Sequence, residues 1–257
     1  MLGACSAGDV VSEPVDGGID GSSTVPSRDA SGDGSLVPDA ADGPIDGGPA
    51  DGGLTTTVEV ICRSAWGAAE PLGTFSEHTL SRLTVHHTAV ELVDNTGAPA
   101  RVRAHQRFHQ EDRGWPDLAY HFVVDRNGHI YEGRPVDAVG DTGTTYDPTG
   151  HFLVVAEGNF ETQSPTEAQL AAVASLLAWG SHELDVPVDT LGGHRDYADT
   201  ACPGASLGAF VDDGTLADMI RTRLAAGPIR TRSICGAEGD ARIAEIESGT
   251  DRPYEWP

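Results

Sequence analysis

The sequence contains no lysine. All 16 of its basic residues are arginine, and they stand against 40 acidic residues, which gives a formal net charge of −24. Recognition of phosphate backbones requires clustered positive side chains, so this composition excludes nucleic acid as a partner. Long hydrophobic runs are also missing, because no stretch approaches the roughly 20 consecutive apolar residues of a membrane-spanning helix. We therefore expect no transmembrane segment.

Hydrophobic residues are scarce in one part of the chain. Residues 1–57 contain ten acidic residues and one arginine, together with 12 of the 32 glycines. Such a segment cannot bury enough apolar surface to offset the entropy lost on ordering, so we expect a disordered acidic tether over residues 1–57. The rest of the chain is long enough to form a core. We expect one folded domain over residues 58–226 and a loop-like C-terminal extension over residues 227–257.

The first residues of the chain carry a separate signal. Leu2–Cys5 (LGAC) resembles a bacterial lipobox, in which the cysteine becomes the lipidated first residue of the mature protein. This resemblance implies an exported protein of the bacterial cell envelope or periplasm, with a lipid anchor at Cys5 in the native protein. The basic and apolar segments that a signal peptide requires do not precede the motif. An incidental cysteine is therefore the alternative.

Apolar patterning and turn residues predict an α/β domain. Four segments have strand character, over residues 83–88, 120–124, 129–131 and 152–156. Asn127-Gly128 favours a hairpin between two of these strands. Helices are predicted over residues 100–110, 168–184 and 215–225. Ser164–Glu167 (SPTE) gives the second helix an N-cap, a proline in the first turn and a capping-box glutamate.

Two histidines and a cysteine are candidate metal ligands. His86 lies on a predicted strand, and His194 precedes Cys202 by eight residues in a predicted loop. Nitrogen and thiolate ligands suit zinc, and a site with three protein ligands leaves a fourth position open. The spacing alone is equally explained by a surface histidine and a cysteine buried as a small apolar residue, because the chain contains ten histidines.

The surrounding sequence distinguishes these alternatives. Six blocks follow one another in order, namely RSAWGA (63–68), VHHTA (85–89), GWPDLAYHF (114–122), DRNGHIYEGR (125–134), EGNF (157–160) and GHRDYADTACPG (193–204). Together they resemble the peptidoglycan recognition protein and phage-lysozyme group of N-acetylmuramoyl-L-alanine amidases, over about residues 60–225. The resemblance implies a central mixed β-sheet flanked by α-helices on both sides, with one zinc groove.

It also implies an activity for the domain at residues 58–226. The reaction is zinc-dependent hydrolysis of the amide bond between N-acetylmuramic acid and L-alanine in peptidoglycan. A non-catalytic peptidoglycan-binding module is the alternative, because many members of the group bind without cleaving. Non-catalytic relatives characteristically lack the cysteine ligand, which this chain keeps. We expect a monomer that binds Zn²⁺ and peptidoglycan.

The resemblance assigns the metal ligands to His86, His194 and Cys202. His87 is the alternative first ligand, but neighbouring residues on a strand point to opposite faces, so the two histidines do not both bind easily.

Two further residues match catalytic positions of the group. Tyr120 matches a strand tyrosine that lies beside the metal and assists catalysis, and Thr200 stands where phage enzymes carry a lysine and active recognition-protein amidases a threonine. Related recycling amidases have a strand glutamate at a position that matches Val155 here. Glu157 shares a face with that position, but we assign it no catalytic role.

Substrate preference follows from three residues. In recognition proteins a Gly-Trp pair, matched by Gly114 and Trp115, occurs with an arginine, matched by Arg134, in members that prefer meso-diaminopimelate stems. A guanidinium can bind the additional carboxylate of such a stem. Ordinary turn and packing residues are the alternative interpretation.

The remaining cysteines are Cys62 and Cys235. If Cys5 is an anchor and Cys202 a ligand, these two are left to form a disulfide that ties the extension to the first strand, in an oxidising compartment. Two free thiols explain the sequence equally well.

Overall fold

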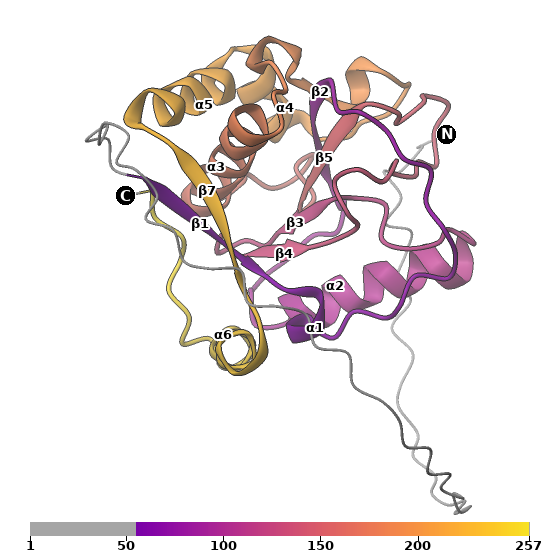
Figure 1. Ribbon diagram of the computed structural model, residues 1–257, viewed down its shortest axis with the longest axis vertical. Coiled ribbons are helices and arrows are strands. Elements are labelled where there is room, and N and C mark those ends of the chain that lie inside the picture. The colour runs from indigo at the N-terminus through magenta and orange to yellow at the C-terminus, as the bar shows by residue number, and fades with distance from the viewer. Residues whose placement is uncertain (1–54, 257) are drawn as a thin grey trace, which may run out of the picture. The chain divides into compact units, whose positions relative to one another are not determined.

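The computed structural model describes residues 55–256 (Figure 1). The lipobox-like segment and the predicted tether as far as residue 54 lie outside the described residues. The last two residues of the predicted tether, Thr56 and Thr57, belong to the first strand. In the described part of the chain, no helix has the length and apolar character needed to cross a membrane.

The fold is built on one seven-stranded sheet. Its spatial order is β6-β2-β5-β3-β4-β1-β7, and every neighbouring pair is parallel except β3 and β4, which form the expected hairpin. The strands are β1 (Thr56–Ile61), β2 (Arg82–His87), β3 (Phe122–Val124), β4 (Ile130–Glu132), β5 (His151–Ala156), β6 (Gly192–Gly193) and β7 (Ile229–Ile234). The predicted mixed sheet is confirmed.

Helices cover both faces of this sheet, as Figure 1 shows. Side chains of α3 (Glu167–Glu183), α4 (Ala205–Asp212) and α5 (Thr215–Ala226) join one hydrophobic cluster with the inward residues of the strands. Side chains of α1 (Arg63–Trp66), α2 (Ala98–Arg107) and α6 (Gly236–Ser248) join a second cluster on the opposite face. The helix α2 continues as a π-helical turn over Phe108–Asp112.

The N-cap of α3 lies two residues later than predicted. Thr166, not Ser164, is the N-cap, and its hydroxyl accepts a hydrogen bond of 3.0 Å from the backbone N–H of Gln169. This bond satisfies one of the N–H groups that a helix leaves unpaired at its first turn. Pro165 therefore precedes the cap instead of occupying the first turn.

The loop-like prediction for residues 227–257 is wrong for most of that segment. Strand β7 pairs with β1 along six residues, and α6 follows it. In the segment IRTRSI the two terminal isoleucines are buried and the four polar residues between them are half-buried or exposed. β7 is an edge strand of the sheet, so one of its sides is open. The C-terminal extension is thus part of the sheet.

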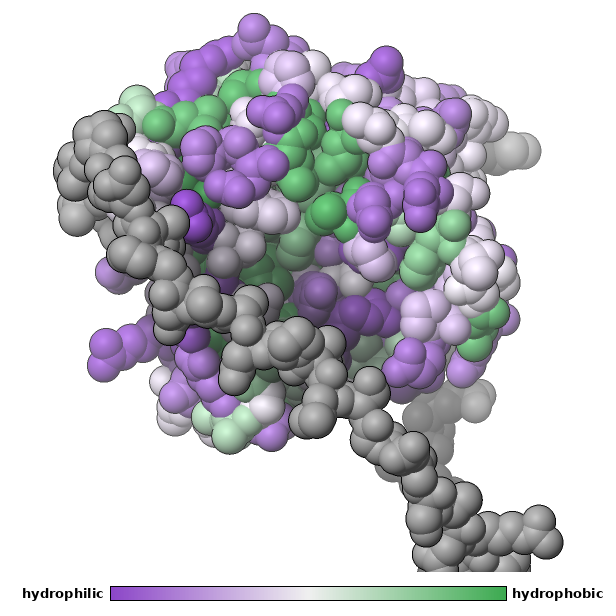
Figure 2. Space-filling model, viewed as in Figure 1, coloured by the Kyte–Doolittle hydropathy of each residue, from purple (hydrophilic) through white to green (hydrophobic). Residues whose placement is uncertain are grey.

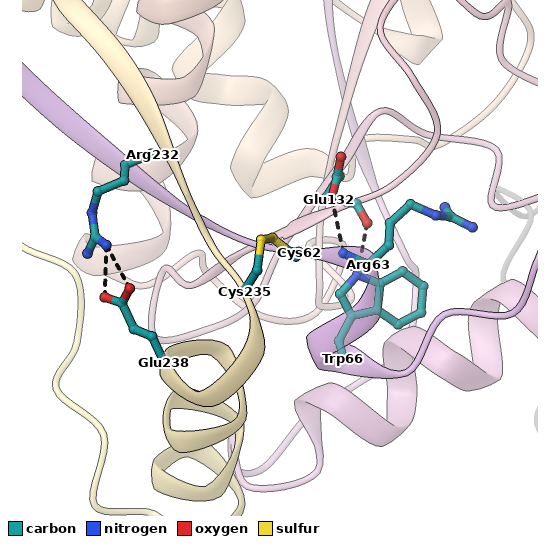
Figure 3. The surroundings of a disulfide bond; sticks show 7 residues. All are labelled: Cys62, Arg63, Trp66, Glu132, Arg232, Cys235 and Glu238. Atoms are coloured by element: carbon teal, nitrogen blue, oxygen red, sulfur yellow. Dashed lines mark hydrogen bonds and ion pairs between the residues drawn. A yellow bond between two sulfur atoms is a disulfide. The ribbon is translucent and has the colours of Figure 1, made fainter. Parts of the chain in front are cut away.

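Cys62 and Cys235 form a disulfide, with a Cα–Cα distance of 5.2 Å (Figure 3). Cys62 follows the end of β1, and Cys235 precedes α6. The bond closes the corner where β1 and β7 end side by side. Beside it, Trp66 Nε1 donates a hydrogen bond of 2.9 Å to the carbonyl oxygen of Glu132, which fixes α1 against β4.

Candidate metal centre

Three side chains that can bind a metal meet beside the ends of β2 and β6. The ligand atoms of His86, His194 and Cys202 all lie within 4.8 Å of one another, and all three residues are buried. The predicted ligand set is therefore brought together by the fold.

The pairing of β6 with β2 explains why the two histidines meet. In this parallel pair Val85 lies opposite Gly193, so the next residue on each chain, His86 and His194, is also adjacent. Gly193 permits this arrangement, since a Cβ at that position would lie 2.6 Å from Cδ of Pro203. A side chain at Gly193 would push the segment that carries the cysteine away from the strand.

Local hydrogen bonds hold the cysteine in place. The carbonyl oxygen of Cys202 accepts a bond of 2.8 Å from the N–H of Arg195, and its N–H donates to Thr200 Oγ1 at 3.3 Å. The sulfur lies 3.6 Å from Nδ1 of His86 and accepts the N–H of His87 at 3.4 Å. By accepting this hydrogen bond, the Thr200 side chain helps to hold the loop that carries Cys202 in its conformation.

His87 faces the other side of the sheet. Its Nδ1 accepts a hydrogen bond of 3.2 Å from the N–H of Phe160, and the two rings stack with centroids 6.0 Å apart. His87 is thus used to order the segment after β5. The structure brings His86, and not His87, to the cluster.

The two histidines of the cluster have lowered pKa values, which favour the neutral form that binds a metal cation. Burial lowers the pKa of His86 well below its usual range, and burial together with nearby His151 lowers that of His194 to about 4. Both rings are neutral at pH 7, the form that offers a lone pair to a metal. Among the described residues, no hydrogen-bond partner reaches the buried Nε2 of His86. Two imidazoles and a sulfur form a donor set that zinc accepts, so these residues fit the ion that the sequence implies.

Tyr120 lies directly beside the cluster. Its ring centroid is 5.1 Å from that of His86. Burial raises the pKa of Tyr120 well above its usual range, so the phenol keeps its proton and can donate a hydrogen bond.

A row of rings extends from the cluster to Trp115. The ring centroid of His109 lies 5.9 Å from that of Tyr120, and the ring centroid of Trp115 lies 4.9 Å from that of His109. Gly114 has a φ of +69°, a left-handed conformation that favours glycine and turns the chain into this row. The sequence motifs assign no function to His109. The signal that could have found it is its i, i+4 spacing from His105, which places both histidines on one helix face.

Arg134 is placed differently from the other predicted substrate-binding residues. It is 2% exposed, and its guanidinium donates hydrogen bonds to the carbonyl oxygens of Leu118 (2.6 Å), Val139 (2.5 Å) and Asp117 (3.1 Å). It also pairs with Asp141 at 2.6 Å. The side chain ties two loops together, and a substrate carboxylate would have to compete with Asp141 for it.

The end of β5 carries a buried carboxylate outside the cluster. Val155 is apolar and packed in the core, whereas Glu157 is fully buried and pairs with Arg101 at 2.9 Å. Burial raises the pKa of Glu157 to about 7, against the opposing effect of Arg101. His105 Nε2 lies 3.7 Å from this carboxylate. No strand glutamate therefore stands at the position of Val155.

Comparison with known proteins identifies the family. The model of the N-acetylmuramoyl-L-alanine amidase family matches residues 76–205, which include all three candidate ligands. The chain belongs to this family. Among amidase relatives, the N-acetylmuramoyl-L-alanine amidase of Homo sapiens is 38% identical over 152 residues, which are 56% of this chain and 26% of the human protein. The chain thus spans about a quarter of that relative's length.

Recognition proteins of the same family are similar over a larger share of their length. Peptidoglycan-recognition protein LB of Drosophila melanogaster is 32% identical over 161 residues, which are 60% of this chain and 68% of that protein. A crystal structure of peptidoglycan recognition protein-LE in complex with tracheal cytotoxin, a monomeric diaminopimelic acid-type peptidoglycan, matches with a TM-score of 0.55 and 31% identity. It covers 61% of this chain and 92% of that one. The expected family and fold are confirmed.

Proposed function

We propose that this chain is a zinc-dependent amidase that hydrolyses the bond between N-acetylmuramic acid and L-alanine in peptidoglycan. The observation that carries the proposal is the buried cluster of His86, His194 and Cys202 with Tyr120 against it. A binding module needs a surface that recognises peptidoglycan, but it has no need of a neutral, buried set of zinc ligands beside a protonated phenol.

The reaction needs three contributions. The scissile amide is stabilised by resonance, and zinc held by His86, His194 and Cys202 would supply the Lewis acidity that activates water near pH 7 and polarises the carbonyl group. Tyr120, protonated at pH 7, is placed to donate a hydrogen bond to the oxyanion that develops on that carbonyl oxygen. Thr200 is proposed to orient water or substrate with its hydroxyl group, next to the cysteine loop that it already holds.

We further propose that the stem peptide lies in a groove along the row of rings from the cluster to Trp115. Support for a diaminopimelate-type stem comes from the relative that binds tracheal cytotoxin and from the match at Gly114, Trp115 and Arg134. A protein that cleaves lysine-type peptidoglycan as fast as the diaminopimelate type would contradict this preference.

The place of action is proposed from the sequence and one structural feature. A disulfide between Cys62 and Cys235 is typical of an oxidising compartment, which supports export to the bacterial envelope or periplasm. Lipidation at Cys5 of the native protein and a monomeric state complete the proposal. Labelling of cells with a clickable fatty acid, with Cys5→Ala as the control, tests the anchor.

The decisive experiment is mass spectrometry of diaminopimelate-type peptidoglycan after digestion by the purified protein. We expect free stem peptides that begin with L-alanine, their loss with a chelator and their return with added zinc. Cys202→Ser should release none. A protein that binds zinc stoichiometrically and binds peptidoglycan, but releases no peptide, would be a binding module and would overturn the proposal.

A further inference from the structure

One side chain outside the cluster contacts a candidate ligand directly. Thr144, in the segment before β5, places its Oγ1 2.8 Å from Nε2 of His194. Threonine is not a residue type that usually binds zinc, so the sequence does not single out Thr144. Its contact with His194 depends on a pairing of segments 50 residues apart, which only the fold provides.

A second threonine orients the first. Thr142 Oγ1 lies 2.8 Å from Thr144 Oγ1, and it accepts the backbone N–H of Thr144 at 3.1 Å. If the Thr144 hydroxyl also donates its proton to Thr142, the lone pairs of Thr144 Oγ1 are left to face His194. The two threonines then form a short chain of hydrogen bonds that ends on the imidazole.

The direction of this chain matters for metal binding. A neutral imidazole carries its proton on one nitrogen and a lone pair on the other, and a metal binds the lone pair. When His194 donates from Nε2 to Thr144, the proton is fixed on Nε2 and the lone pair on Nδ1. Groups that fix the tautomer of a ligating histidine in this way raise metal affinity.

Packing fixes the ring itself. The imidazole of His194 packs against the ring of His86, with centroids 4.7 Å apart and an interplanar angle of 52°, and against the ring of Tyr146, at 4.8 Å and 56°. These contacts restrict rotation of the imidazole, and the hydrogen bond from Nε2 to Thr144 favours the tautomer with the proton on Nε2.

We propose that Thr144 is a positioning residue for the metal centre. Its hydroxyl accepts a hydrogen bond from Nε2–H of His194, which leaves the lone pair on Nδ1 for the metal, while Thr142 orients the Thr144 hydroxyl. This inference rests on the zinc site of the proposed function. It assigns a role to the segment at residues 141–149, which neither the ligand set nor the substrate row includes.

Zinc affinity, measured by competition with a chromophoric chelator, tests the inference. Thr144→Val keeps the shape and removes the acceptor, so we expect zinc binding about 10- to 100-fold weaker than in the wild type. Thr144→Ser keeps the hydroxyl and should bind nearly as well as the wild type. Thr142→Val should cause a smaller loss of zinc affinity. The Thr144 hydroxyl that accepts from His194 is still present, but it no longer has Thr142 Oγ1 as the acceptor for its own proton. Equal or tighter binding by Thr144→Val would overturn the proposal, since a tighter site would mean that Thr144 competes with the metal for Nε2.

A second measurement does not depend on zinc. Nitrogen-15 NMR of the zinc-free wild type should show the Nε2–H tautomer for His194, and Thr144→Val should show a mixture of tautomers. A wild type that carries the proton on Nδ1 would overturn the role of Thr144, even if the valine variant failed to fold. Failure of the zinc site as a whole is recognised separately, because the wild type would then bind zinc no better than His86→Ala.

Discussion

The two edges of the sheet have opposite characters. At the β6 edge, histidines and a cysteine are buried with their polar atoms turned toward one another, and β6 itself has only two residues. At the β7 edge, six residues pair with β1, a disulfide closes the corner, and the charged groups are exposed and paired. Buried polar groups without full compensation cost stability. The comparison therefore supports a division in which the proposed chemistry depends on the β6 edge and the β7 edge contributes stability.

The β7 edge carries exposed charged residues. In Figure 2, which shows the molecule from the same side as Figure 1, hydrophilic residues separate smaller hydrophobic patches. Arg232 belongs to the charged residues of the β7 edge and pairs with Glu59 and with Glu238, the latter at 2.8 Å. Figure 3 shows the pair with Glu238 close to the disulfide. Exposed pairs of this kind contribute little individually, so the disulfide is expected to dominate the stability of this edge.

The largest effect is expected from removal of a ligand at the β6 edge. His86→Ala should reduce zinc binding and amidase activity to background, because two ligands do not hold zinc at a three-ligand site. The measurements are zinc stoichiometry and stem-peptide release. His182→Ala, which removes an exposed histidine of α3, is the matched control and should behave as the wild type. Normal activity of His86→Ala would contradict the assigned site.

Acid should destabilise the protein through buried histidines of β2 and β5, the strands that follow β6 in the sheet. Burial lowers the pKa of His87 and of His151 to about 4 in the folded state, from a usual 6.5. Between these values the unfolded chain binds protons that the folded one does not. The free energy of unfolding should therefore fall as the pH drops from about 6.5 to about 4, by up to about 1.4 kcal/mol per pH unit for each such histidine. Glu157, whose pKa is raised, makes the free energy of unfolding rise as the pH falls, but it is a single group opposed by the two histidines.

Urea titrations of the zinc-free protein at several pH values measure this dependence. A free energy of unfolding that stays constant between pH 4 and 6.5 would show that the buried histidines keep ordinary pKa values.

Removal of the disulfide should separate stability from activity. The double variant Cys62→Ser/Cys235→Ser opens a crosslink between residues 173 apart in the sequence. We expect the free energy of unfolding to fall by about 2–5 kcal/mol, with kcat/KM retained under conditions where the variant is folded. Loss of zinc binding in the folded double variant would contradict the independence of the two edges.

Tyr120→Phe should separate chemistry from metal binding within the β6 edge. The ring remains and the donor is lost, so we expect kcat to fall by about 10²–10³-fold. Zinc affinity and thermal stability should stay close to those of the wild type. If the rate were unchanged, the oxyanion would have another donor.

The smallest effect is expected at the exposed ion pairs of the β7 edge. Arg232→Ala removes the pairs with Glu59 and Glu238, and we expect a loss of no more than about 1 kcal/mol, smaller still at high salt. Arg230→Ala, at an exposed position of the same strand, is the control. A loss as large as that of the disulfide variant would show that the charged network, and not the crosslink, holds this edge.

Much of the β6 edge could be predicted from the sequence. The strand expected over residues 83–88 is β2, one residue earlier, and motif blocks far apart in the chain correctly group His86, His194 and Cys202. This grouping could be predicted because the six ordered blocks resemble a family whose fold brings these positions together, whereas the residue types and their spacing alone left it open. The role of Thr144 could not be predicted, because it depends on which segment lies across from it in the folded chain. His109 differs, since its i, i+4 spacing from His105 is already visible in the sequence.

The β7 edge shows the opposite limitation. A parallel edge strand needs a partner far along the chain, and IRTRSI carries no local signal that β1 is that partner. The pairing of Cys62 with Cys235 was similarly open, because a sequence gives the number of cysteines but not their distances. Gly192–Gly193 is a strand only through its pairing with β2, since glycine has low strand propensity.

The position of β1 has a consequence for the order in which the protein can fold. Of the described strands β1 is synthesised first, yet its two neighbours are β4, made some 70 residues later, and β7, which follows all the others. Until β7 has been synthesised, one side of β1 exposes unpaired N–H and C=O groups that invite pairing with another chain. During synthesis a nascent chain would therefore depend on assistance or rapid completion to avoid association, and truncation before β7 would leave that side of the sheet permanently open.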